Sequence, residues 1–309
     1  MDPPRKLTAQ FLVTQSQVGL STARPVRAQT RHTGTHVFLH DHTYYEICLI
    51  NDGRATHQTE WFDAPARQGT VAVIPPGRIH GFRDGTGLVG TDVYYLAEWL
   101  LGELKSLWGH SGLVPLFLSA LLFPRLKQAR PFQFDLDARE YEAAMIELED
   151  IKREDGSKTP SILYLESCFL KFLILLSRSY MRQAPRELGF EFRREVWFAL
   201  ERIEEVAFGS QAFSVGDLAH QIGMSADHFQ RIFKEATGWS PSEYFQMRRY
   251  QFACKLLLSP ESRISDVAYR LGYSDAAHLS RVFKQFHGIS PREYRQLYAA
   301  EHRQESSDS

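Results

Sequence analysis

The sequence predicts an α+β protein of several domains, with a β-rich N-terminal part and an all-α C-terminal part. Three observations lead to this fold class. Short alternating runs of apolar and polar residues, separated by Gly, Pro and Asp-Gly, fill residues 7–97. Longer segments of helical periodicity follow from residue 98. Between Phe213 and Tyr294 nearly the same pattern occurs twice, which indicates a duplicated supersecondary unit.

The length and composition suit two or three globular domains. The 309 residues are 43% hydrophobic, which is enough for several cores. The net charge is −1, but residues 211–296 hold 11 Lys and Arg against 8 Asp and Glu, whereas the rest holds 25 against 29. The modest positive charge therefore lies where the pattern is duplicated.

Several features predict a cytoplasmic protein with no membrane partner. Cys48, Cys168 and Cys254 lie far apart in apolar contexts, and we expect them to be reduced core residues. The N-terminus lacks the apolar core of a signal peptide. The most apolar run, residues 162–176, contains two charged residues and is too short to span a bilayer.

Residues 1–97 are assigned to one β domain, a sandwich or barrel, because many short strands at regular spacing are typical of these folds. The expected strands are residues 37–39, 45–50, 54–59, 70–74 and 93–96. The Asn51-Asp-Gly53 sequence between two of them is a hairpin signal.

Four polar residues of this domain form a candidate site. His40, His42 and Glu46 share parity, so on one continuous strand they would all point into the barrel. His80 follows a Pro-Pro-Gly turn and can approach from another strand. Three imidazoles and a carboxylate suit Fe, Mn, Ni or Zn. Together with nearby aromatic rings they also suit a hydroxylated organic ligand.

Residues 98–181 are predicted to be helical and to mediate dimerisation. Two short helices, 98–108 and 114–122, precede two long ones, 137–154 and 160–180. The last is apolar around much of its circumference, so one face is expected to pack on the barrel and another on a second subunit. Packing within one chain alone is the alternative. A linker is expected at residues 182–192, and a disordered tail at residues 299–309.

Residues 193–298 are predicted to form an all-α domain that contains the duplication. Each copy has a short periodic segment, then Gly-x-Ser, then a longer segment, which is the pattern of two helices joined by a tight turn. Gly223 and Gly272 would end the first helix of each pair. Ser225 and Ser274 would cap the second.

The second helix of each copy has an outward face that suits DNA reading. Its inward residues are Phe229, Ile232, Phe233 and Ala236 in the first copy, and Leu279, Val282, Phe283 and Phe286 in the second. Its outward residues are Asp227, Gln230, Arg231 and Lys234 in the first copy, and Ala277, Ser280, Arg281 and Lys284 in the second. The expected contact set also includes Ser225, His228, Ser274 and His278 at the helix starts.

Arg pairs with guanine, Gln pairs with adenine, and Lys contacts phosphate. A solvated face is the alternative for either helix alone. Two helix pairs joined by a long helix over residues 242–258 could instead enter successive major grooves, roughly 34 Å apart. Double-stranded DNA is therefore the predicted partner.

The C-terminal motif resembles the AraC-type family of bacterial transcriptional regulators. Residues 272–284 read Gly-Tyr-Ser-x-x-x-His-x-x-Arg-x-Phe-Lys, and Gly288-x-Ser-Pro-x-x-Tyr294 follows. The resemblance covers about the last hundred residues. It implies two helix-turn-helix units on one chain, a homodimer formed through the helical segment, and RNA polymerase as a further partner.

The N-terminal spacing resembles the cupins. The matching positions are Gly34, His40-x-His42, Glu46 and Gly53, then Gly69, Pro75-x-Gly77 and His80, with Asp84 where the family usually has Asn. This resemblance implies a β jelly-roll barrel over roughly residues 20–97. Regulators of the AraC type commonly bind a small organic effector in such a barrel. The likeness to arabinose- and rhamnose-type sensors favours a sugar or sugar acid.

The combined prediction is a sequence-specific transcriptional regulator, either an activator or a repressor, and not an enzyme, controlled by a sugar-like effector. The effector-binding residues are predicted to be His40, His42, Glu46, His80, Trp61 and Asp92. No cofactor is required, although the first four of these residues could hold a divalent transition metal. One or two of the histidines can equally be ordinary barrel residues. A cupin enzyme fused to a DNA-binding domain and constitutive DNA binding with a vestigial barrel are the alternatives.

Overall fold

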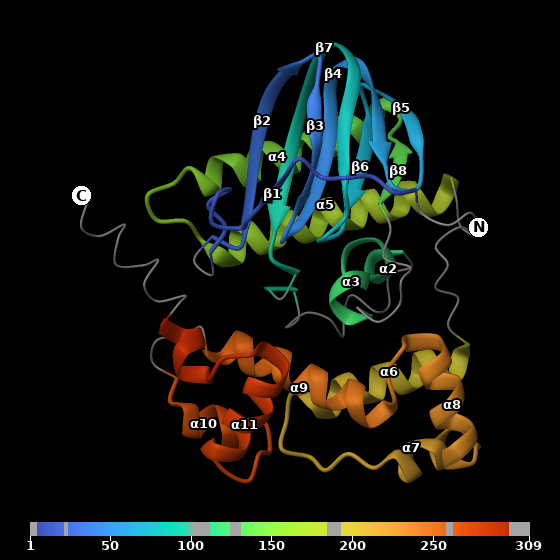
Figure 1. Ribbon diagram of the computed structural model, residues 1–309, viewed down its shortest axis with the longest axis vertical. Helices are drawn as coiled ribbons and strands as arrows, with labels where there is room; N and C mark the ends of the chain where they lie inside the picture. Colours follow the sequence, from blue (N-terminus) through green and yellow to red (C-terminus); the bar gives the residue numbers. More distant parts are fainter. Residues whose placement is uncertain are drawn as a thin grey trace. The chain divides into compact units, whose positions relative to one another are not determined.

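The computed structural model describes residues 5–21, 24–97, 99–100, 112–123, 131–183, 193–257 and 262–296. These residues form two compact units. The first unit is drawn from residues up to 97 and from residues 112–183, and the second mainly from residues 193–296. A β-sheet with associated helices makes up the first unit, and helices alone make up the second (Figure 1). The predicted fold class is confirmed.

An eight-stranded sheet forms the body of the first unit. Its strands are β1 (Phe11–Val13), β2 (Val26–Gly34), β3 (Val37–His42), β4 (Tyr45–Thr59), β5 (Asp63–Arg67), β6 (Thr70–Ile74), β7 (His80–Tyr95) and β8 (Phe132–Asp135). The long strand β7 pairs antiparallel with β2, β3 and β4. Strand β4 also pairs with β5 and β6, and β6 pairs with β8. Residues of β7 therefore meet residues from three other strands.

The predicted hairpin at Asn51-Asp-Gly53 is wrong. Strand β4 continues through these residues for 15 residues in all, and its register with β7 shifts on both sides of Asp52. Gly53 has a φ of 77°, and a Cβ at this position would lie 2.4 Å from the carbonyl oxygen of Gly87. The turn-forming residues therefore build a bulge where two backbones approach closely.

Strand β7 is much longer than the predicted residues 93–96, because glycines interrupt its apolar pattern. A Cβ at Gly81 would lie 2.6 Å from the carbonyl oxygen of Val37, and one at Gly85 would lie 2.8 Å from that of Thr35. These glycines mark close backbone approach and do not end the strand. The prediction for residues 70–74 is confirmed by β6, whereas β1, β2, β5 and β8 were not predicted.

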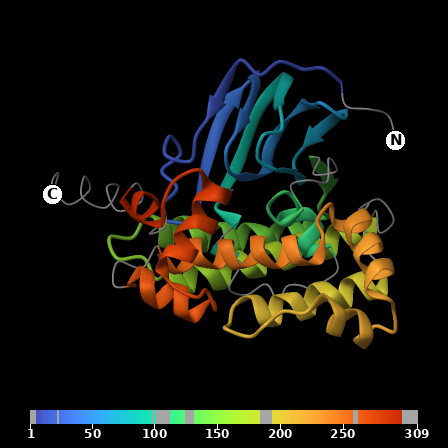
Figure 2. The same ribbon diagram turned by 60° about the horizontal axis from the view of Figure 1, so that its bottom comes forward.

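Helices complete the first unit. They are α2 (Leu113–Phe117), α3 (Ser119–Leu122), α4 (Ala138–Asp155) and α5 (Ile162–Gln183). Asp137 and Glu140 form a capping box at the start of α4. Helices α4 and α5 pack on each other along one side of the sheet (Figure 2). The rings of Phe132 and Phe134 on β8 meet that of Tyr180 on α5 edge-on.

The second unit contains α6 (Arg194–Ala207), α7 (Val215–Gln221), α8 (Ala226–Thr237), α9 (Pro241–Leu257), α10 (Ile264–Arg270) and α11 (Ala276–His287). Both views show the pair α7–α8 near one end of α9 and the pair α10–α11 near the other (Figures 1 and 2). The predicted duplicated helix pairs on a long connecting helix are therefore confirmed. Most of the predicted helix at residues 98–108, most of the linker and the whole tail lie outside the described residues.

A buried ion pair holds α9 against α6. Arg248 Nε lies 2.5 Å from Glu204 Oε1, and Arg248 Nη2 lies 2.7 Å from Glu204 Oε2. The Tyr244 hydroxyl donates a hydrogen bond to the same carboxylate at 3.1 Å. No described helix is long and apolar enough to cross a membrane.

Candidate effector and DNA-binding sites

A cavity of about 110 Å³ lies inside the first unit, lined by residues of β1, β2, β3, β4 and β7. This volume is several times what one buried water molecule needs. Its polar lining includes Arg31, His40, Glu46, His80, Asp92 and Tyr94, and its apolar lining includes Val37, Ile50, Phe82 and Leu88. The cavity thus combines apolar walls with a group of charged and hydrogen-bonding side chains, as small-molecule sites do.

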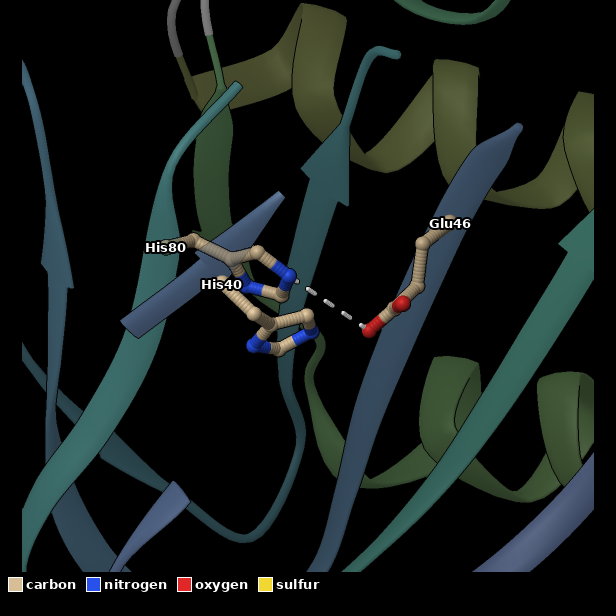
Figure 3. A group of neighbouring side chains, drawn as sticks. All are labelled: His40, Glu46 and His80. Carbon is tan, nitrogen blue, oxygen red and sulfur yellow. Dashed lines mark ion pairs between the residues drawn. The ribbon is translucent and has the colours of Figure 1, made fainter. Parts of the chain in front are cut away.

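His40, Glu46 and His80 converge in this cavity from three strands (Figure 3). One nitrogen or oxygen atom of each lies within 4.8 Å of the others. The His40 and His80 ring centres are 4.4 Å apart, and His80 Nε2 lies 3.9 Å from Glu46 Oε1. The three residues are only 7%, 5% and 1% exposed. Among the described residues, neither ring nitrogen of His80 has a hydrogen-bond partner.

Strand pairing, and not one continuous strand, brings these residues together. Strand β3 ends at His42, and β4 begins at Tyr45, so the expected uninterrupted strand from His40 to Glu46 is wrong. His40 lies opposite His80 in the β3–β7 pairing. Glu46 lies opposite Tyr94 of β7. Two strands that share β7 as a neighbour therefore deliver both side chains to the interior.

The other predicted effector residues differ in position. Asp92 lines the cavity and pairs with Arg31 at 3.2 Å. His42 is fully buried but is not on the lining; its Nδ1 lies 2.7 Å from the Tyr44 carbonyl oxygen, and its Nε2 lies 3.8 Å from Glu46 Oε2. Trp61 does not line the cavity either, so its expected wall contact is not found.

Burial shifts the pKa of the titratable groups around the cavity. Desolvation lowers the pKa of His42 to about 3 and that of His80 well below its usual value. Desolvation, reinforced by the nearby Asp92 carboxylate, raises the pKa of Glu46 well above 4.5. The imidazoles are therefore neutral at pH 7, which is the form that binds a metal or accepts a hydrogen bond.

His57 is a buried neighbour of this site that the sequence analysis missed. Its Nδ1 lies 2.8 Å from Gln133 Oε1, its ring stacks on Phe82 at 4.8 Å, and its ring centre is 5.9 Å from that of His80. Arg31 was also missed, because β2 is mostly polar and has no apolar alternation. Only the pairing of β2 with β7 could have placed Arg31 beside Asp92.

The donor set fits a divalent transition metal. His40, Glu46 and His80 would be its ligands, and His42 is the next candidate because its Nε2 has no hydrogen-bond partner among the described residues. Such an ion would supply a Lewis acid or an anchor for a ligand oxygen. The same atoms can also hydrogen-bond the hydroxyl or amine groups of an organic ligand.

The predicted outward faces of the recognition helices are exposed. These exposed residues are Asp227, Gln230, Arg231 and Lys234 on α8, and Ala277, Arg281 and Lys284 on α11; Ser280 is half-buried. Phe286, which was predicted to point inward, is 36% exposed and stacks on Tyr250 at 5.1 Å. Arg231 Nη2 contacts His228 Nδ1 at 3.0 Å. The exposed polar side chains can reach a bound partner.

The caps of these two helices differ. Ser225 caps α8 as predicted, because its hydroxyl accepts a hydrogen bond from the His228 backbone N–H at 3.4 Å. The predicted Ser274 cap is wrong. Asp275 caps α11 and accepts from the His278 backbone N–H at 2.7 Å. His228 is five positions after Gly223, but His278 is six after Gly272, so the extra residue moves the cap by one.

Comparison with known families agrees with these two sites. Residues 25–163 match the AraC-like ligand binding domain, and residues 218–297 match a helix-turn-helix domain. The two matches define a transcriptional regulator with a ligand-binding domain and a DNA-binding domain. The chain belongs to the AraC-type family of transcriptional regulators.

Curated relatives are similar over most of the chain. The HTH-type transcriptional activator RhaR of Mannheimia succiniciproducens is 25% identical over 265 residues, which cover 83% of this chain and 86% of that protein. RhaS of Citrobacter koseri is 24% identical over 243 residues, covering 77% and 80%. These relatives are activators, so the chain is a regulator rather than an enzyme. Among solved structures, apo ToxT of Vibrio cholerae has a TM-score of 0.40 and 14% identity, covering 87% of this chain and 96% of that one.

Proposed function

We propose that a small sugar or sugar derivative binds in the cavity of the first unit and controls transcription activation by the helix-turn-helix unit. The observation that carries this proposal is a buried polar side chain on the cavity wall without hydrogen-bond partners among the described residues. This side chain is His80, and both of its ring nitrogens lack a partner. A polyhydroxylated ligand supplies donors and acceptors to such groups, and its C–H faces can pack on Phe82 and Tyr94.

Alanine substitutions at Glu46 and His80 test the effector site. Loss of one hydrogen bond to a buried ligand costs about 1–3 kcal/mol. Each variant should therefore bind the effector roughly ten- to a hundredfold more weakly and keep its effector-free DNA binding. The ligand is first found by a thermal-shift screen of sugars, sugar acids and divalent metals, since a ligand that binds only the native state raises its stability.

The exposed His36 provides a matched control, because His36→Ala also removes an imidazole but does not touch the cavity. Its effector affinity should equal that of the native protein. Unchanged effector response in all four single alanine variants at His40, His42, Glu46 and His80 would show that the cavity is not the effector site.

A bound metal that helps to hold the effector is a second candidate, favoured by the 4.8 Å cluster of His40, Glu46 and His80. Metal analysis distinguishes a site that holds the effector through a metal from a site that binds the organic ligand alone. A stoichiometric transition metal that is lost in His80→Ala would support the metal. Native protein purified without chelators and still free of metal would leave the organic ligand alone.

We also infer a homodimer formed through α4 and α5. Ile146 on α4 and Leu163 on α5 are 63% and 74% exposed, and Ile162 and Tyr164 are further exposed apolar residues of α5. Ile146→Asp and Leu163→Asp should give monomers that bind a single DNA site weakly. Arg139→Asp, at an exposed position at the start of α4, should remain dimeric. Sedimentation at micromolar concentration measures this, and a monomeric native protein would refute the dimer.

The remaining assignments extend the same proposal. The predicted DNA-contact residues of α8 and α11 would enter successive major grooves, with RNA polymerase as the partner of the DNA-bound dimer in the cytoplasm. The proposal keeps the predicted domain limits: residues 1–97 bind effector, residues 98–181 dimerise, and residues 193–298 bind DNA. A footprint of two adjacent major grooves per chain would support this arrangement.

A further inference from the structure

We propose that the effector carries a positive charge, as an amino sugar does, and that its ammonium group binds between Glu46 and His80. This rests on the proposed function, in which the cavity binds a sugar derivative. Amino sugars should therefore bind more tightly than neutral sugars, and sugar acids should bind most weakly. The supporting observations are the charges on the cavity lining, the partners of those charges, and the 3.9 Å between Glu46 Oε1 and His80 Nε2.

The lining contains more acid than base. Its acidic side chains are Glu46 and Asp92, and its one Arg or Lys is Arg31. Glu46 faces Tyr94 across the β4–β7 pairing, and Asp92 faces Cys48, so the two carboxyl groups are diagonal neighbours on one face of the sheet. Arg31 can offset the charge of only one of them.

Asp92 already has its partners. Its Oδ2 lies 3.2 Å from Arg31 Nε and accepts a hydrogen bond from the Tyr94 hydroxyl, also at 3.2 Å. The Arg31 guanidinium carbon lies 5.5 Å from the Tyr94 ring centre, and its side chain is 47% exposed. Arg31 is therefore already paired with Asp92, and a ligand carboxylate bound to Arg31 would lie beside the Asp92 carboxylate.

Glu46 differs from Asp92 in having no such partner. Its side chain is 7% exposed, and no described side chain or backbone group donates a hydrogen bond to it. His42 Nε2 lies 3.8 Å and His80 Nε2 lies 3.9 Å from its carboxylate oxygens, and both are too far for hydrogen bonds. Burial raises the pKa of the Glu46 carboxyl, so its negative charge is favoured only when a compensating cation or donor lies beside it, and the cavity is where one can enter.

The gap between Glu46 and His80 fits an ammonium group. A nitrogen about 2.9 Å from both Glu46 Oε1 and His80 Nε2 would bridge the 3.9 Å between those atoms. An ammonium offers three donors, so one remains for a third acceptor in the cavity, whereas a hydroxyl offers one. The Tyr44 and Tyr94 rings, which meet edge-on at 5.2 Å, provide π faces on the same lining. A ligand carboxylate would instead place like charge beside Glu46.

Two matched ligand series test the charge directly. The first compares D-glucosamine, D-glucose and D-glucuronate, together with their galacto and manno counterparts. The second compares cyclohexylamine, cyclohexanol and cyclohexanecarboxylate, which share a ring but lack the sugar hydroxyls. Affinities are measured by calorimetry on the full-length protein after treatment with a chelator. We expect the amine to bind at least tenfold more tightly than the neutral member, and the carboxylate to bind most weakly.

Glu46→Gln removes the charge with little change of shape and should erase the advantage of the amine. Asp41→Asn is its control, since Asp41 lies on β3 next to the site but not on the lining; this variant should keep the full advantage. Thermal stability of the ligand-free variants shows whether each is folded. The ligand series in native protein remains decisive if Glu46→Gln does not fold.

The outcomes separate this inference from the proposed function. Equal binding of amine and neutral members, or tighter binding of a carboxylate, overturns the positive charge while a sugar effector stands. Binding of cyclohexylamine without any sugar supports the charge and overturns the sugar. Failure of all ligands to bind, with stabilisation by Zn²⁺ or Mn²⁺ alone, overturns both in favour of a metal site.

Discussion

The two helix-turn-helix units share a pattern but differ in how they are held and in what they offer to DNA. Helix α9 supports them through two consecutive arginines. Arg248 forms a buried ion pair with Glu204 of α6. The guanidinium carbon of Arg249 lies 5.0 Å from the centre of the Tyr273 ring, which is in the turn of the second helix-turn-helix. Helix α9 is thus held to α6 by an ion pair and to the turn of the second helix-turn-helix by a cation–π contact.

The recognition faces differ in the same way. Helix α8 presents Gln230 at an exposed position. At the corresponding position of α11, the Ser280 hydroxyl donates a hydrogen bond to the Ala276 carbonyl oxygen at 2.7 Å. Its polar group is already used within the helix, so α11 has fewer free groups for base reading. Two helix pairs of the same fold can therefore differ in how many side-chain groups they offer for contacts with DNA bases.

Loss of the ionic support should have the largest effect. Glu204→Ala leaves Arg248 buried without its partner, and breaking such a pair costs about 3–5 kcal/mol. Arg249→Ala removes a desolvated cation–π contact worth about 2 kcal/mol. Hydrogen exchange of the α6 and α9 amides in the full chain measures both. A loss of protection in Arg249→Ala that equals or exceeds that in Glu204→Ala would contradict the proposed difference.

Base reading should depend mainly on the first helix-turn-helix, α7–α8. Arg231→Ala should cost about 1–3 kcal/mol and relax specificity at one base pair. Ser280→Ala should change specificity little. A mutational scan of the operator should therefore show the sharper half-site under α8. Equal losses of Arg231→Ala on specific and random DNA, or a sharper half-site under α11, would refute this assignment.

Phosphate contacts should be alike in the two helix-turn-helix copies, because Lys234 and Lys284 occupy corresponding exposed positions. Replacing either by Ala should weaken binding to all sequences uniformly and lower the salt slope by about one. Affinity measured over a range of salt concentrations tests this. Unequal slopes for the two variants would extend the asymmetry to the DNA backbone.

The caps should give the smallest difference, visible in the pH dependence. Ser225→Ala should destabilise α8 by about 1 kcal/mol at any pH. The hydrogen bond from the His278 backbone N–H holds the pKa of Asp275 below its usual value. This cap therefore stabilises α11 fully above the ordinary Asp range and is lost as the pH falls through the lowered pKa. Hydrogen exchange at acid pH should loosen α11 before α8, and Asp275→Asn should remove that difference.

Local signals made the helical unit predictable. Gly223 and Gly272 have φ near 70° at the ends of the turns, as their spacing suggested. The error at Ser274 arose from one additional residue, which leaves the motif recognisable but changes which side chain reaches the N–H groups. The sequence pattern places the start of a helix to within one residue. The identity of the capping side chain depends on that one residue, as the cap of α11 by Asp275 shows.

The cavity was predictable only in part. His40, Glu46 and His80 follow from spacing, and the structure brings them together. Arg31 and His57 reach the region through pairing between strands distant in sequence, which no local pattern encodes. Trp61 was included because it is near the other residues in sequence. Its ring instead lies beneath Arg78, with the guanidinium carbon 5.2 Å from the ring centre.

The unequal recognition faces of α8 and α11 have one more consequence. Helices α8 and α11, which are connected through α9 and present different side chains, cannot be interchanged by a two-fold rotation. A half-site recognised by one chain therefore has a direction, and reversing it would place each helix over the bases meant for the other. Such a chain distinguishes upstream from downstream before any second subunit binds, so the orientation of the DNA site can fix which flank of the bound protein faces the promoter.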